Sequence, residues 1–433
     1  MNARPFAVGL MLLAASLAPV YAPAADQVPR SGTLPHGGSY VLSTDTTIAA
    51  AAIDLWFRAP GAGYDDALPG IARLAATAVA SAPLESGKSL VALVRSAGGR
   101  LSINAYPDIV GISVIVPATA ARRIVAAITS AYFAPSFDDN ALKVAQRDMA
   151  VLGVQKRYSS DQLLHDDLFA TIFSEGPAHY PSIPMAVSDL TKVSLSDATT
   201  FAKRAFRSGN ATLTLTGNID ASVVGAVTAG SGGSMDAPHQ SQPAPSPLAR
   251  ATAAAAVSGT GIAWVGPAIA DERSATAMDF IADYLFRDDT GLVSASVDSP
   301  ESYVSGQFIT LHDPGVMLVT VGGDKASDAT QRVLDAVAKM EQPLDAAAFA
   351  AAREAFLYHL ASDTQLPQQQ ADNLGWYATE GNLPYAPSTA DSAYWSAARS
   401  LDPAFVASIA KRYLGHPVVV QLQPATPTKE SAS

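Results

Sequence analysis

The chain has 433 residues, of which 48% are hydrophobic and 15% are charged, and its formal net charge is -11. That length suits two or more domains, and that composition excludes a chain that is disordered throughout. The acidic balance argues against nucleic acid and anionic membrane surfaces as partners. The chain has no cysteine, which excludes disulfides, thiolate metal sites and a cysteine nucleophile.

The N-terminus has the pattern of a secretory signal peptide. Arg4 is followed by an apolar run from Phe6 to Val20 and then by small residues. We assign residues 1–25 to this signal peptide and not to an anchor, because the apolar run is short for a membrane span. Cleavage is expected after one of three small residues: Ala22, Ala24 or Ala25. The mature protein is then expected to be periplasmic or secreted, with no membrane span.

Helices and strands alternate through the first part of the chain. In order, the sequence predicts strands within Ser39–Leu55 and at Ala51–Phe57, a helix from Pro69, an amphipathic segment at Leu90–Ala97 that Gly98 and Gly99 end, strands at Arg100–Ala105 and Gly111–Val116, a helix with apolar positions at Ile124, Ile128 and Tyr132, a helix from an Asp138 N-cap to about Lys156, helices within Ser160–Phe173 and Ser196–Phe206, and a strand at Thr212–Thr216.

The composition changes near the middle of the mature chain. Residues 228–258 are rich in Gly, Ser, Pro, Ala and Gln, which is typical of a linker. We therefore predict an N-terminal domain at 26–227, a linker at 228–258, a C-terminal domain at 259–424 and a disordered tail at 425–433.

The second half repeats the first at a nearly constant offset of 208 positions. Three landmarks align, each with a similar context: Trp56 with Trp264 at the end of a strand, Pro135 with Pro343 before N-cap residues Asp138 and Asp345, and Ala202–Arg204 with Ala410–Arg412 before a final strand, the second of which is Val418–Leu422. The predicted fold class is therefore α+β, with two homologous halves, each a mostly antiparallel sheet with helices packed on it.

Several short segments of the first half occur in a characteristic order. They are Gly70-Ile71-Ala72 at a helix start, Gly98-Gly99, Asn104-Ala105-Tyr106, the strand Gly111–Val116, Pro135 to Asp138, and Gly209 to Thr212 before a strand that ends in Gly217. Their order and spacing resemble the insulinase/pitrilysin family of zinc metallopeptidases, whose relatives include processing peptidases and core proteins of the cytochrome bc complex. The resemblance covers nearly the whole mature chain and implies two homologous halves joined by a linker.

In active members of that family, the helix carries His-x-x-Glu-His. Its two histidines bind zinc from one helical face, its Glu activates water, and a downstream Glu completes the site. The matching positions here are Arg73, Ala76 and Thr77, and the downstream position is Gly153 or Val154. Arg stays protonated, and Ala, Gly and Val offer no ligand. The sequence therefore predicts no catalytic residue, no metal ligand and no cofactor.

The family also carries an Arg and, seven residues later, a Tyr that hold substrate backbone. Arg287 matches the Arg, whereas the Tyr position is Ser294. We predict Arg287 as a substrate-binding residue that holds a peptide carboxylate or carbonyl. The alternative is a solvated arginine at a helix end that pairs with Asp288 or Asp289.

Other kinds of active site have little support in the sequence. The seven histidines form no ligand-like pattern, and His359 is expected to pair with Asp363 one helical turn later on the surface. There is no G-x-S-x-G elbow of a serine hydrolase. Gly87-Lys88-Ser89 lacks the rest of a phosphate-binding loop.

The leading functional hypothesis is a catalytically inactive insulinase-family homologue. We expect it to form a heterodimer with a zinc-bearing subunit, to contribute surface to a chamber for peptide substrates, and to stabilise that partner. The alternative is a free-standing peptide-binding or scaffold protein, as a homodimer. A third hypothesis, an autonomous metallopeptidase with atypical ligands, predicts stoichiometric zinc in the purified protein.

Overall fold

The computed structural model describes residues 28–59, 68, 70–106, 108–173, 187–230, 232–233, 249–288, 290–297, 302–323, 326–389 and 391–424. The predicted signal peptide at 1–25 and the predicted tail at 425–433 lie outside these residues. Within the described ranges, no helix has both the length and the apolar character needed to cross a membrane.

The first half contains a six-stranded sheet in the order β1-β2-β6-β3-β5-β4. Its neighbouring strands are antiparallel except for β2 and β6, which are parallel. The elements are β1 (Arg30–Thr33), β2 (Ser39–Thr44), β3 (Ala50–Arg58), α1 (Ile71–Ser81), α2 (Leu90–Ser96), β4 (Arg100–Ala105), β5 (Ile109–Pro117), η1 (Ala118–Ala120), α3 (Ala121–Phe133), α4 (Asp139–Lys156), α5 (Ser160–Ile172), α6 (Val187–Leu190), α7 (Leu195–Ala205), η2 (Ser208–Asn210), β6 (Ala211–Gly217) and η3 (Ala221–Ala226).

The second half contains a five-stranded sheet in the order β7-β11-β8-β10-β9, with β7 and β11 as its parallel pair. The elements are β7 (Ala249–Ala255), β8 (Gly259–Val265), α8 (Glu272–Phe286), α9 (Ser294–Val297), β9 (Ser302–Ile309), β10 (Val316–Gly323), α10 (Ala326–Lys339), α11 (Ala346–Ser362), α12 (Pro367–Glu380), η4 (Leu383–Tyr385), α13 (Ala393–Arg399), α14 (Pro403–Tyr413) and β11 (Val418–Pro424). This strand order repeats β2-β6-β3-β5-β4. The predicted α+β fold with two similar halves is confirmed.

Two of the three repeat landmarks occupy equivalent places. The Asp138 carboxylate accepts a hydrogen bond from the Ala141 N–H at the start of α4, and Asp345 caps α11 in the same way. Each helix follows the proline that aligns between the two halves, Pro135 before α4 and Pro343 before α11. The Ala-Lys-Arg segments end α7 and α14 immediately before the last strand of each half.

The third landmark, Trp56 with Trp264, is wrong by one residue. Trp56 of β3 faces α12, and its partner on the neighbouring strand β5 is Gly111. Its counterpart by register is Ala263, which pairs with Leu318 and faces α5. Because strand side chains alternate between faces, the shift of one residue places Trp264 on the opposite face, against α8 and the other outer helices.

The composition also concealed a strand. β7 lies within 228–258, the range predicted as linker, and pairs in parallel with β11 at the sheet edge. Its sequence, Ala-Arg-Ala-Thr-Ala-Ala-Ala, has few of the β-branched or aromatic residues that usually indicate a strand. Pairing with β11 therefore determines its conformation.

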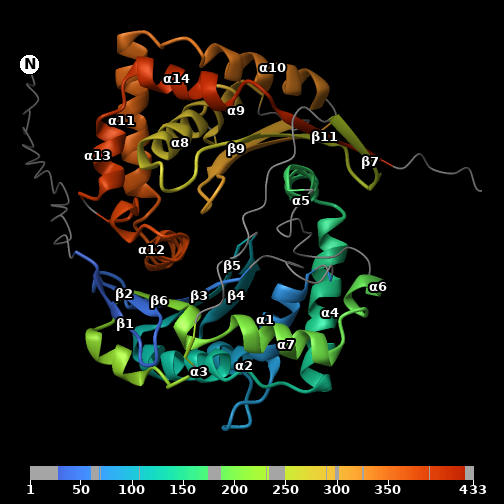
Figure 1. Cartoon of the computed structure of the whole chain (residues 1–433), viewed down its shortest axis with the longest axis vertical. Helices are drawn as coiled ribbons and strands as arrows, with labels where there is room; N and C mark the ends of the chain where they lie inside the picture. The colour runs from blue at the N-terminus through green and yellow to red at the C-terminus, as the bar shows by residue number, and fades with distance from the viewer. Residues whose placement is uncertain are drawn as a thin grey trace, which may run out of the picture.

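The two halves exchange one helix each. α5 belongs to the first half by sequence but packs on β8, β10 and β11, whereas α12 of the second half packs on β3, β5 and β6 (Figure 1). The α5 core is made of Leu163, Leu164, Leu168, Phe169 and Ile172, against Ala263, Leu318, Val418 and Val420 of the second sheet. The halves are therefore held together by their cores and not by the linker alone.

Glycines allow both exchanged helices to approach closely. A Cβ on Gly375 of α12 would lie 2.0 Å from Trp56 Nε1, and one on Gly261 of β8 would lie 2.7 Å from Leu168 Cδ1. Neither distance is possible between real atoms, so each position needs glycine for contact between helix and sheet.

Candidate functional site

α1 and α4 bring together the two segments of the expected zinc site. They pack side by side, with Arg73, Ala76 and Thr77 on α1 and Gly153 and Val154 on α4. The Thr77 hydroxyl donates to the Arg73 carbonyl at 2.8 Å, and the Ala76 carbonyl accepts from the Tyr132 hydroxyl at 2.8 Å. The two helices of the expected site therefore lie together, and the Thr77 hydroxyl and the Ala76 carbonyl form hydrogen bonds within the protein.

The residues at these positions do not fit a zinc ion. A guanidinium has no lone pair to offer, Ala, Gly and Val have no donor atom, and a neutral threonine hydroxyl is a poor ligand. In the described part of the chain, no group of three or more His, Cys, Asp or Glu residues is arranged to hold a metal.

A buried cation lies at the end of α4, close to the same place. The Lys156 amine, whose residue is 2% exposed, forms an ion pair with buried Asp166 on α5. Burial lowers the pKa of Lys156 to about 8, Asp167 acts in the opposite direction, and the positive charge of Arg73 contributes to the decrease. This ion pair joins α4, which packs within the first half, to α5, which packs on the second sheet.

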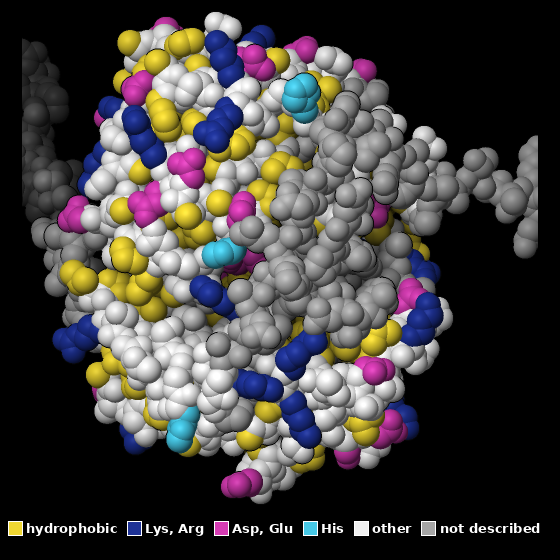
Figure 2. Space-filling model, viewed as in Figure 1, with side chains coloured by type: hydrophobic (Ala, Val, Ile, Leu, Met, Phe, Trp, Pro, Cys, Tyr) yellow, Lys and Arg dark blue, Asp and Glu magenta, His cyan; other side chains and the backbone are white. Residues whose placement is uncertain are grey.

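A cavity of about 630 Å³ lies between the halves. Its walls come mainly from α8, β9, α11 and α12, and Tyr106 and α5 close the side of the first half. Its Phe, Tyr and Trp lining residues are Tyr106, Phe169, Phe308, Phe356, Trp376, Tyr377 and Tyr394. On the face in Figure 2, hydrophobic side chains are exposed between charged ones where the halves meet. A chamber with both apolar and charged walls suits a peptide better than it suits a small apolar ligand.

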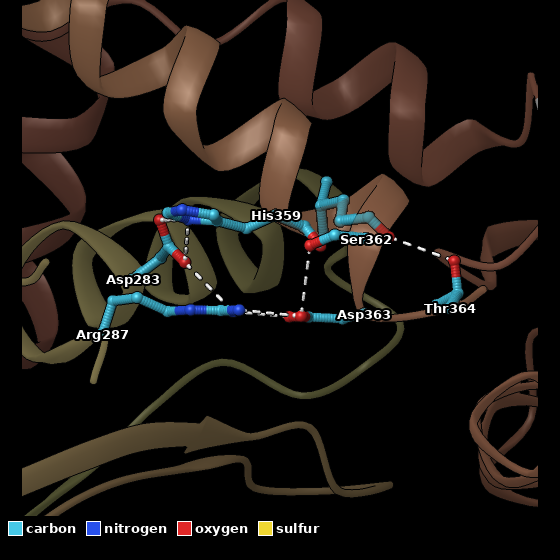
Figure 3. Close-up of polar contacts among 7 residues, drawn as sticks. Asp283, Arg287, His359, Ser362, Asp363 and Thr364 are labelled. Atoms are coloured by element: carbon cyan, nitrogen blue, oxygen red, sulfur yellow. Dashed lines mark hydrogen bonds and ion pairs between the residues drawn. The ribbon is translucent and has the colours of Figure 1, made fainter. Parts of the chain in front are cut away.

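Arg287 lines this cavity, but its guanidinium is already paired. Its two terminal nitrogens donate to the Asp363 carboxylate at 2.5 and 2.7 Å, and Asp283 lies 3.7 Å away (Figure 3). The predicted alternative partner Asp288 is not the one observed, and Asp289 lies outside the described residues. A ligand at Arg287 would therefore compete with Asp363. The role of Arg287 in substrate binding stays a prediction.

The expected pairing of His359 with Asp363 is wrong. The His359 Nδ1 lies 2.9 Å from both carboxylate oxygens of Asp283 on α8, while Asp363 pairs with Arg287 (Figure 3). Each helix thus carries an acid and a base one turn apart, and each acid pairs with the base on the other helix. Ser294, at the family's Tyr position, is buried and donates to the Val304 carbonyl at 3.0 Å, so it is part of the packing of β9.

The cavity wall raises the pKa of several carboxyl groups. Desolvation raises the pKa of Asp279 to about 7, although the Tyr394 hydroxyl donates to it at 2.7 Å. Asp372 faces the cavity, yet surrounding protein desolvates it and raises its pKa to about 6. By contrast, the Arg287 guanidinium holds the pKa of Asp363 below its usual value. Sequence reasoning missed Asp279, Asp283 and Asp372.

Two carboxyl groups meet at the contact between the halves. Asp108 precedes β5, Glu380 ends α12, and the two side chains are hydrogen-bonded to each other. Burial is the largest cause that raises both pKa values, and the Asp108 charge also raises that of Glu380. One further contact crosses this boundary: the Arg58 Nε donates to the Thr379 carbonyl at 2.7 Å. Within the second half, the His312 Nδ1 lies 3.0 Å from the Glu380 carbonyl.

We expect this pair to make the fold less stable as pH rises. Because both pKa values are raised in the fold, the folded state holds more protons than the unfolded state above pH 4.5, the ordinary pKa of Glu380. Glu380→Gln keeps the hydrogen bond without the second charge, so it should gain ~1–2 kcal/mol relative to wild type between pH 5 and pH 8. Urea unfolding at both pH values measures this. Glu354→Gln on exposed α11 should follow the wild type, and equal slopes for both variants would contradict the prediction.

No protein-family model and no curated protein matches the chain, but solved structures match nearly all of it. A protease from Helicobacter pylori is 15% identical with a TM-score of 0.77, over 92% of this chain and 100% of its own. A peptidase M16 inactive domain from Pseudomonas fluorescens is 16% identical with a TM-score of 0.71, over 93% and 99%. A chain of complex III2 from Candida albicans, with Inz-5 bound, is 13% identical with a TM-score of 0.72, over 91% and 95%.

The chain has the fold of M16-like peptidases. The predicted insulinase-like fold is therefore confirmed, and the three likenesses span both halves of the described structure.

Proposed function

We propose that the protein is a non-catalytic subunit of a two-subunit zinc peptidase, exported to the periplasm or secreted. One observation carries the proposal: α1 and α4 pack side by side, and the α1 positions where the resemblance implies zinc ligands and a base hold Arg73, Ala76 and Thr77, which do not fit zinc. The cavity between the halves, with its apolar and charged walls, supports peptide binding by the same chain. The subunit's role is to complete the peptide chamber and to stabilise the partner that holds zinc.

The likeness to an inactive domain of peptidase M16 supports the absence of catalysis. The likeness to a chain of complex III2 supports a role within an assembly of several subunits. In the partnership, the zinc-bearing subunit supplies the hydrolytic chemistry, and this chain supplies surface that orients an extended peptide.

The test is co-purification from the native source, followed by size exclusion, metal analysis and a cleavage assay with an unfolded peptide. We expect one joint peak with a companion that carries His-x-x-Glu-His, about one zinc per pair, and cleavage by the pair alone. This chain by itself should hold no zinc and cleave nothing. A self-associating chain that has no companion would support the scaffold alternative instead. Stoichiometric zinc with chelator-sensitive cleavage by the lone chain would overturn the proposal.

A further inference from the structure

α12 covers a row of polar side chains on the first sheet. Asp54 on β3 lies opposite Thr214 on β6 and Ser113 on β5 in the strand register. Directly opposite residues of neighbouring antiparallel strands point to the same face, so these three side chains form one row. Gly375 of α12 lies so close to this face that a Cβ on it would be 2.8 Å from the Thr214 hydroxyl oxygen. The row therefore lies between the sheet and the helix.

The acid and the threonine of this row are buried without partners. Asp54 and Thr214 are both 0% exposed. Among the described residues, no hydrogen-bond partner reaches either carboxylate oxygen of Asp54 or the Thr214 hydroxyl. Burial and the charge of Asp372 raise the pKa of Asp54 well above its usual value, while the nearby Ser113 hydroxyl and Val114 N–H act in the opposite direction. Because a buried polar group without a partner costs free energy, this row indicates a site for a ligand that binds oxygen atoms.

α12 runs along β3 in the direction of the strand. The carbonyl of its first residue, Pro367, accepts a hydrogen bond from the Thr216 hydroxyl. Thr216 lies opposite the residue two positions before Asp54. Gly375 of the same helix lies against Trp56, two positions after Asp54. The turn of α12 between these two contacts therefore lies over Asp54.

Asp372 belongs to this turn and lies on the side of the helix toward β4 and β5. Gln368, one turn earlier on the same side, accepts a hydrogen bond from the Arg100 guanidinium of β4 at 3.2 Å. Arg100 is thus directed at Gln368. In the described part of the chain, no ion pair joins a cation to Asp54 or Asp372. Two carboxyl groups therefore lie close together under α12, and no side chain pairs a positive charge with them.

The side chains around this point offer only oxygen ligands, from two carboxyl groups and two hydroxyls. Such hard donors suit Ca²⁺ or Mg²⁺ and do not suit zinc. Ca²⁺ accepts about six to eight oxygens in a flexible geometry, with carboxylates that bind through one or both oxygens. Mg²⁺ needs a nearly ideal octahedron and keeps several waters, which a buried row does not allow. A divalent ion also balances the charges of two carboxylates, so the site fits Ca²⁺ best.

We propose that a Ca²⁺ ion binds between the first sheet and α12, held by the carboxylates of Asp54 and Asp372. The hydroxyls of Thr214 and Ser113 complete the ligands from the sheet, and water reaches the ion from the cavity that Asp372 borders. The ion would join an exchanged helix to the sheet that it covers and so strengthen the contact between the halves. This inference does not depend on the proposed function, because it needs neither a companion subunit nor a peptide.

The first experiment follows thermal unfolding of the purified chain by circular dichroism, with EDTA and then with added Ca²⁺ at physiological ionic strength. We expect a Kd of about 10⁻⁴ to 10⁻³ M, as in extracellular calcium modules. A concentration of about 10 mM Ca²⁺ should then raise the melting temperature by about 2–5 °C. An unchanged melting temperature would overturn the proposal, and so would an equal response to Mg²⁺.

Calorimetry gives a second readout of the same binding. Because the folded protein holds a proton on Asp54 near neutral pH, Ca²⁺ should displace about one proton at pH 7. Titrations in two buffers with different ionisation enthalpies measure this release. Binding without proton release would place the ion elsewhere and overturn the assignment to Asp54.

Three variants test which side chains hold the ion. Asp54→Asn should abolish the response to Ca²⁺, yet it should melt no lower than the wild type in EDTA, because it removes a buried carboxyl group without a partner. Thr214→Val keeps the shape and should weaken Ca²⁺ binding by about tenfold. Asp335→Asn makes the same charge change as the first variant on exposed α10 and should keep the full response. A response that persists in Asp54→Asn would show that Ca²⁺ acts on the acidic surface and would overturn the proposal.

Discussion

Separating the chain into residues 26–233 and 249–433 is expected to leave neither half able to fold alone. Without α12, the first sheet exposes Trp56 and its neighbours, and without α5 the second sheet exposes Ala263, Leu318 and Val420. Each large apolar side chain contributes ~1.5–3 kcal/mol when it is buried. Five such residues of α5 together approach the whole stability of a domain, ~5–15 kcal/mol.

Co-expression should restore the fold, because the two chains can exchange α5 and α12 as the intact protein does. We expect a 1:1 complex with a cooperative thermal transition, measured by size exclusion and circular dichroism. Leu168→Asp on α5 should abolish the complex, since this side chain is fully buried against the second sheet. Val151→Asp on α4 is the matched control, because Val151 is 54% exposed. A lone half that unfolds cooperatively as a monomer would refute the prediction.

The exchange itself could not be predicted from the sequence. The leucines of α5 indicate that one face is buried, but the pattern does not say which sheet covers it. Local signals, in contrast, were sufficient for most elements. An Asp before an apolar periodic segment placed the starts of α4 and α11, because an N-cap depends only on residues within one turn.

The register of β8 shows the limit of single-residue matches. A tryptophan at offset 208 looked equivalent to Trp56, yet the structure places Ala263 there. Close packing explains the difference: α12 contacts Trp56 through Gly375, whereas α5 brings Leu168 onto Gly261 and leaves no room for a large ring on that face. In the first half the strand carries the large side chain and the helix carries the glycine, whereas in the second half the helix carries the large side chain and the strand carries the glycine.

The candidate site was the least predictable part, because its members come from different helices. Asp283 pairs with His359 and Arg287 pairs with Asp363, each pair 76 positions apart. The sequence did hold one signal, an acid and a base one turn apart on each helix, which permits pairing across helices as well as along them. The positions of the expected zinc site, in contrast, were predicted from a local motif, since all three of the α1 positions lie within two helical turns.

Loss of the buried charge at the end of α4 is the second large effect that we expect. Lys156→Met should destabilise the protein by ~3–5 kcal/mol, because it leaves Asp166 buried without its cation. Asp166→Leu should cost a similar amount for the converse reason. Urea unfolding of each variant at pH 7 measures these changes in the free energy of unfolding.

The double variant Lys156→Met with Asp166→Leu distinguishes a paired charge from simple packing. Because apolar residues of similar volume replace both charges, its cost should be ~2 kcal/mol or less, well below the sum of the single variants. Lys143→Met on the same helix is the control: its ion pair with Asp139 at 2.5 Å is exposed, so the free energy of unfolding should stay close to that of the wild type. Additive single and double variants would contradict the pairing. A strong coupling between the two substitutions would mean that the Lys156 amine, through Asp166, holds α4 against α5. This contact lies next to the α1 and α4 positions whose residues do not fit zinc.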